Sequence, residues 1–90
     1  MIQRRYKMEV TPEMSRKVQL IAFKHGKSWG DRKEVMKTDM PYLFIDDNSL
    51  EALGEDDDTT FLEDINELIT PEKFIQLYGN HEPDENGNLW

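Results

Sequence analysis

Residues able to carry out covalent catalysis are few in this chain. The 90 residues include no cysteine and two histidines, His25 and His81. The serines Ser15, Ser28 and Ser49 lie outside the G-x-S-x-G context that exposes a nucleophile on a sharp turn. His25 falls where a helix is expected to end and where the helix dipole favours a charged imidazole, so we expect it to cap or pack. The sequence therefore predicts a protein that is not an enzyme.

Carboxylates are the other groups that could do chemistry here. Asp46 and Asp47 follow an apolar strand, a position where Mg²⁺-binding acids are often found, and Glu63, Asp64 or Glu67 could add a ligand. Acids are dense enough in this half of the chain that some converge by chance, and no Gly-rich phosphate loop accompanies them. We therefore expect neither a metal nor a cofactor. The lack of cysteine also excludes disulfides and favours a reducing cytoplasm.

Charge is distributed unevenly along the chain. Residues 1–37 carry ten basic and four acidic side chains, giving +6, whereas residues 38–90 carry one basic and fifteen acidic side chains, giving −14. Such asymmetry indicates a surface made for a charged partner. The alternative is that the two halves fold against each other and their charges partly neutralise. If they do so between chains, the protein could be a homodimer.

The acids are concentrated between residues 46 and 67, a stretch without a basic residue. Carboxylates spaced on a rigid scaffold can imitate phosphates and steer a basic partner into contact, whereas an ordinary solvated loop would only maintain solubility. The candidate partner-binding acids are Asp46, Asp47, Glu55, Asp56, Asp57, Asp58, Glu63 and Asp64.

Two aromatic residues are candidate contacts for the same partner. Trp29 follows the expected end of a helix in a polar segment, where an exposed indole could anchor an interface, and Phe23 precedes it on the helix. The alternative for Trp29 is packing over the helix end as a lid on a thin core.

A nucleic-acid interface is the second hypothesis. Basic side chains recur along the first helix and could track phosphates, although the overall pI of about 4.6 opposes it. The residues of this candidate face are Arg16, Lys17, Lys24 and Lys27.

The elements that must position these residues have clear local signals. Thr11-Pro12-Glu13 and Thr70-Pro71-Glu72 each combine an N-cap hydroxyl, a first-turn proline and an acid, and predict helices at about 12–25 and 71–78. Gly26 is the expected left-handed stop of the first. Alternating apolar residues predict a strand at 4–10.

The remaining segments have weaker signals. We expect a strand at 42–45, further short strands or extended edges at 33–37, 59–62 and 65–69, a loose helical turn at 50–53, and a solvated loop at 55–58.

Together these elements predict an α+β fold. A three- or four-stranded, mostly antiparallel sheet with both helices on one face is the simplest packing. We expect residues 1–79 to form a single domain and residues 80–90 to form a mobile acidic and polar tail. The longest apolar runs are four residues, whereas a membrane span needs about 20, so no membrane association is expected.

Several of these segments resemble small uncharacterised accessory proteins encoded by tailed bacteriophages. The similarity covers about residues 6–78 and is carried by the run Tyr6–Ser15, by Val18, Gln19, Phe23, Gly26 and Trp29, and by the segments 42–45 and 67–74. These are strand, cap and core positions, so the resemblance implies no site residues. It implies a small protein in the cytoplasm of an infected bacterium, of a class that often binds and inhibits host or defence proteins.

Overall fold

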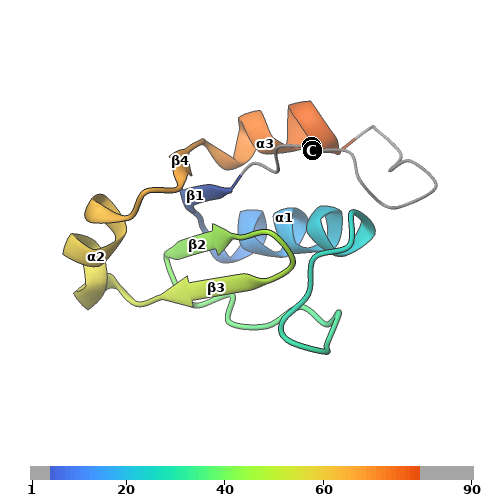
Figure 1. The fold of residues 1–90 in the computed structure, drawn as a ribbon, viewed down its shortest axis with the longest axis horizontal. Helices are drawn as coiled ribbons and strands as arrows, with labels where there is room; N and C mark the ends of the chain where they lie inside the picture. The colour runs from blue at the N-terminus through green and yellow to red at the C-terminus, as the bar shows by residue number, and fades with distance from the viewer. Residues whose placement is uncertain (1–4, 80–90) are drawn as a thin grey trace.

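Four short strands form one mixed sheet in the order β3-β2-β1-β4. The computed structural model describes residues 5–79. Its elements are β1 Tyr6–Glu9, α1 Pro12–Lys24, β2 Tyr42–Ile45, β3 Leu50–Leu53, the 3₁₀ turn η1 Glu55–Asp57, α2 Asp58–Glu63, β4 Glu67–Leu68 and α3 Pro71–Tyr78. The pairs β1–β2 and β2–β3 are antiparallel and β1–β4 is parallel, so the predicted α+β class with a mostly antiparallel sheet is confirmed (Figure 1).

Strand register decides which side chains face the main core. Tyr6 pairs with Ile45 and Met8 pairs with Leu43, so these four side chains lie on one face of the sheet. Helices α1 and α3 pack on that face, as expected from their caps and apolar stripes. The buried cluster consists of Tyr6, Met8, Val10, Val18, Ala22, Phe23, Leu43, Ile45, Leu50, Ile69, Phe74 and Tyr78.

Both Thr-Pro-Glu signals begin helices as predicted. The Thr11 hydroxyl accepts a hydrogen bond from the Met14 N–H at 3.2 Å, and the Thr70 hydroxyl accepts one from the Lys73 N–H at 3.1 Å. Helix α1 ends at Lys24, and Gly26 follows with a φ of 89°, the left-handed conformation expected of a helix stop.

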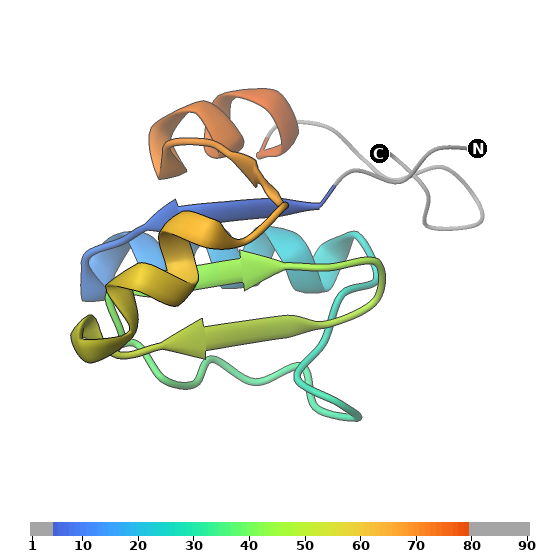
Figure 2. The same cartoon turned by 60° about the vertical axis from the view of Figure 1, so that its left-hand side comes forward.

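The opposite face of the sheet is covered by α2, which the sequence did not predict. The interpretation of residues 59–62 as a strand is wrong: they lie within α2 (Figure 2). The threonines and phenylalanine there favour a strand, but the acids before them stabilise the positive N-terminal end of a helix.

Two other local predictions are also corrected. Residues 50–53 are a strand and not a helical turn, because a tight turn closed by the Asp46 N–H bond to the Ser49 carbonyl folds them back along β2. Residues 33–37 form no strand. Their chain is instead held by Gln19, whose amide oxygen accepts hydrogen bonds from the Met36 N–H and the Trp29 indole, both at 2.9 Å. The expected tail at residues 80–90 lies outside the described residues.

No helix among residues 5–79 has the length and apolar character that crossing a membrane requires.

Candidate functional site

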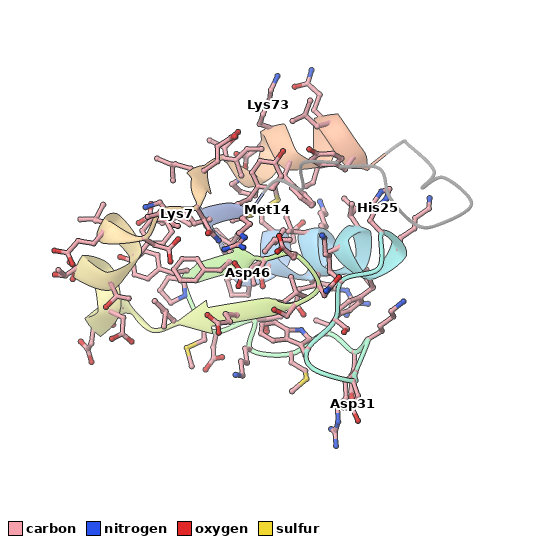
Figure 3. The ribbon with its side chains drawn as sticks, viewed as in Figure 1. Lys7, Met14, His25, Asp31, Asp46 and Lys73 are labelled. Atoms are coloured by element: carbon pink, nitrogen blue, oxygen red, sulfur yellow. The ribbon has the colours of Figure 1, made fainter. Side chains whose placement is uncertain are left out.

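A buried lysine organises the face of the sheet beneath α2. The Lys7 side chain leaves β1 on the face opposite Tyr6 and Met8, and only 7% of the residue is exposed. Its ammonium group donates to the carbonyls of Phe61 at 2.6 Å, Leu62 at 3.2 Å and Asp64 at 2.8 Å. These carbonyls belong to the last turn and C-cap of α2, so a cation neutralises the negative end of this short helix (Figure 3).

An aromatic stack completes this small second core. The Phe61 ring lies almost parallel to that of Tyr42, with centroids 4.4 Å apart, and to that of Phe44 at 5.8 Å. The Lys7 ammonium lies 5.1 Å from the Phe61 centroid, within cation–π distance. Lys7 and Phe61 together therefore fix α2 on the sheet.

The acids on η1, at the start of α2 and at its last residue face the solvent. We call this group the acidic ridge, and it consists of the exposed residues Glu55, Asp56, Asp57, Asp58 and Glu63 on η1 and α2. Acids at a helix N-terminus interact favourably with its dipole, which explains why a run of four like charges is helical here and not the expected loop.

The other candidate acids are held by contacts within the domain. The side-chain amide of Asn66 donates to the Asp46 carboxylate at 2.9 Å, and the Asn66 N–H donates to the Asp64 carboxylate at 2.7 Å. Arg5 donates from two guanidinium nitrogens to the two Asp47 oxygens, both at 3.2 Å. Of the eight acids singled out in the sequence, these three contribute to the fold, and the five of the acidic ridge are presented to solvent.

The Arg5–Asp47 pair links the residue just before β1 to the β2–β3 turn. Its hydrogen bonds and the Asp47 charge raise the pKa of Arg5 above its ordinary value, but both side chains are about half exposed, so the pair adds little stability.

Three of the four candidate basic residues form an exposed stripe on α1. Arg16, Lys17 and Lys24 are exposed, and Lys17 pairs with Glu13 at 3.4 Å. Lys27 does not belong to this stripe, because it is buried and donates to the Asp47 carbonyl at 2.6 Å. Burial lowers the pKa of Lys27, and the nearby Asp47 and Asp46 carboxylates oppose that shift. The predicted nucleic-acid face is therefore smaller than expected.

Neither candidate aromatic residue is a free surface anchor. Phe23 is 8% exposed and belongs to the main core, so it is not available to a partner. Trp29 is half-buried, packs against that core and donates its indole N–H to Gln19. The alternative of a lid over the helix end describes Trp29 better than an exposed anchor.

His25 lies at the end of α1 within the protein. It is buried, its Nε2 lies 3.3 Å from the Tyr78 carbonyl, and its ring contacts that of Tyr78 edge-on. The Tyr78 hydroxyl is in turn hydrogen-bonded to the Tyr6 hydroxyl. These contacts join α1, α3 and β1, which agrees with the packing role expected for His25.

A groove of about 1000 Å³ opens beside the acidic ridge, where β1 leaves the sheet. Its lining is Glu9, Val10, Thr11, Met14, Pro41, Tyr42, Asp58, Phe61, Leu62, Leu68, Ile69, Thr70, Pro71 and Glu72. Three of these are acids and none is basic. Desolvation, and then the charges of Glu9, Asp58 and Glu55, raise the pKa of Tyr42, which lies in this lining.

Sequence reasoning missed the residues that build this region. Lys7 stands between Tyr6 and Met8 in an alternating strand, a pattern that assigns it to solvent. Neither Asn66 nor Phe61 belongs to a recognisable sequence motif. The usable signal was Gly54 followed by four acids, two threonines and an apolar pair, a pattern typical of an acidic first turn of a helix.

Within residues 5–79, no three His, Cys, Asp or Glu side chains gather closely enough to hold a metal ion. Comparison of the chain with models of known protein families, with curated protein sequences and with solved structures finds no match.

Proposed function

We propose that this protein is a non-enzymatic binding protein that captures a basic partner protein through the acidic ridge. The observation that carries the proposal is the ridge itself: five exposed carboxylates on a short helical segment that a buried lysine and an aromatic stack hold in place. The charges are therefore presented on an ordered surface and not on a solvated loop, as phosphate mimicry requires.

Electrostatics gives such a surface its advantage in the rate of capture. A patch of one sign raises the encounter rate with an oppositely charged protein, and the effect weakens with salt. The net charge of −8 adds a long-range field of the same sign. Together with the resemblance to phage accessory proteins, this leads us to propose a host or defence protein of an infected bacterium as the partner, blocked or sequestered in the cytoplasm.

Nucleic-acid binding through α1 is the less favoured function. Three exposed basic residues remain in the stripe, Lys17 pairs with Glu13, and the fourth candidate, Lys27, is buried.

The experiment compares three variant sets in capture from a bacterial lysate, followed by association kinetics with the isolated partner. The ridge set is Asp56→Asn, Asp57→Asn and Asp58→Asn. The matched acidic set is Asp31→Asn, Glu34→Gln and Asp39→Asn, which removes the same charge from exposed positions on the 27–41 connection; Asp31 lies far from α2 (Figure 3). The basic set is Arg16→Gln, Lys17→Gln and Lys24→Gln.

We expect the ridge set to slow association several-fold and to flatten its dependence on salt between about 50 and 300 mM, while the other two sets change little. Equal slowing by the two acidic sets would show that net charge and not the ridge matters. Loss of binding only in the basic set, with nucleic acid as the captured ligand, would replace the proposal by the second function. A measured turnover lost in His25→Ala with the fold intact would refute the non-enzymatic assignment.

A further inference from the structure

We propose that the groove beside α2 binds a peptide segment of the partner in which cationic and aliphatic side chains alternate. This inference rests on the proposed function, because it extends the acidic ridge to a specific docking site. It is carried by two properties of the groove: unusually exposed leucines on its walls and acids without bases in its lining.

The walls of the groove expose apolar surface that the domain leaves uncovered. Leu62 on α2 is 72% exposed and Leu68 on β4 is 67% exposed, and both belong to the lining. The Phe61–Tyr42 stack and Ile69 are also part of the lining. Exposed apolar surface next to a hollow is typical of a protein interaction site.

The charges of the groove select a cationic occupant. Glu9 from β1, Asp58 from α2 and Glu72 from α3 reach it from three different elements. The pKa of Tyr42 is raised first by desolvation and then by the charges of Glu9, Asp58 and Glu55, which oppose formation of its phenolate. A lysine or arginine entering between these acids would gain attraction from several sides.

The positive ends of two helices do not turn the groove into an anion site. Helices α1 and α3 both begin at its edge, but the hydroxyls of Thr11 and Thr70 accept hydrogen bonds from their first turns. Acids also stand in both first turns, at Glu13 and Glu72. These contacts offset the partial positive charge of each helix end.

Two occupants from the chain itself fit less well. Residues 80–90 end in Leu89-Trp90 but contain three acids and no lysine or arginine, so the groove would repel them. A second copy could offer Leu20 among the basic residues of α1, yet two chains of net charge −8 repel each other as they approach. A basic segment of another protein meets neither obstacle.

The test uses three synthetic eight-residue peptides with the intact protein. The first alternates lysine and leucine, the second replaces lysine by glutamate, and the third replaces leucine by serine. Affinity is measured by calorimetry and the site is mapped by backbone amide chemical shifts. The groove variant is Leu62→Ser with Leu68→Ser, and its matched control is Leu20→Ser with Leu77→Ser, which changes two exposed leucines outside the groove.

We expect only the lysine–leucine peptide to bind appreciably, with shifts at the groove lining. The groove variant should bind it about tenfold or more weakly, since each buried leucine contributes substantially to affinity, and the control should bind normally. Three results would overturn the groove assignment: equal binding of the serine peptide, amide chemical shifts confined to the part of the acidic ridge outside the groove, or equal weakening of binding by both leucine variants. Concentration-dependent dimerisation that the peptide displaces would assign the site to a second copy instead.

The same variants separate this inference from the proposed function. The leucine pair leaves every charge of the acidic ridge in place. If partner capture is slowed by Asp56→Asn with Asp57→Asn, two ridge acids outside the groove lining, but is unchanged in the leucine variant, the ridge function stands and the groove assignment falls. If the peptide binds in the groove while the ridge set captures the partner normally, the ridge function falls and the peptide site stands.

Discussion

The two faces of the sheet are built on different principles. Helices α1 and α3 cover one face with a cluster of apolar side chains around Tyr6 and Phe74, neither of them exposed to solvent. Helix α2 covers the other face through one aromatic ring and the lysine that holds its last carbonyls. The first face is stabilised mainly by apolar burial, and the second mainly by a charge and a stack.

This difference determines which face keeps side chains exposed and so where the proposed interaction surface lies. A six-residue helix has little intrinsic stability in water and depends on its contacts. Because few contacts hold α2, most of its side chains stay free for solvent or a partner, and the groove and the acidic ridge both lie on its side. The apolar face, in contrast, has almost every large side chain committed to the core.

The largest effect is expected from removing a ring on the apolar face. Phe74→Ala deletes a fully buried side chain that meets Tyr6 edge-on at 5.9 Å and Tyr78 at 5.1 Å. We expect it to lower the free energy of unfolding by about 3–5 kcal/mol, measured by denaturant unfolding. Leu77→Ala on the same helix is the control, with an expected loss under about 1 kcal/mol. Similar losses for the two would show that α3 is not packed as described.

Removing the cation on the other face should have a smaller and more local effect. Lys7→Met keeps a long unbranched side chain but leaves the carbonyls of Phe61, Leu62 and Asp64 without their charged donor. We expect a loss of about 1.5–3 kcal/mol, the range for hydrogen bonds to charged groups, and faster hydrogen exchange confined to α2. Lys17→Met, at an exposed position, is the control. Exchange that speeds up equally across α1 and α2 would contradict a local role for Lys7.

The same contrast explains how far the sequence predicted the structure. Helices α1 and α3 followed from cap, proline and acid in a fixed order, and β1 from its alternation, because these signals are local. The position of α2 depends on Lys7, which is 54 residues from Phe61, and no local pattern indicates such a contact. Likewise β3 is a strand because β2 pairs with it, although its own residues favour a helical turn.

The candidate site was predictable to a similar extent. The exposure of the acidic ridge followed from charge density alone. The hydrogen bonds from Asn66 to Asp46 and Asp64 could not be predicted in this way, because they form only once the strand order brings these segments together. Burial of Phe23 on α1 and of Lys27, which follows the helix, also depends on tertiary packing, because their local sequence does not decide whether they face solvent.

The smallest predicted effect concerns the potential in the groove. The pKa of Tyr42 lies above its ordinary value of 10.0, through desolvation first and then the Glu9, Asp58 and Glu55 charges. The folded state therefore keeps its proton to higher pH than the unfolded state, and stability from this group is lost as pH rises from about 10 through the raised pKa. Glu9→Gln with Asp58→Asn should move the pKa of Tyr42 back toward 10.0, without reaching it because desolvation remains. Phenolate absorbance against pH measures the shift, with Glu34→Gln and Asp39→Asn as the control pair. An unchanged titration in the Glu9→Gln, Asp58→Asn variant would mean that these acids do not set the potential there, and a cationic occupant would lose its main attraction.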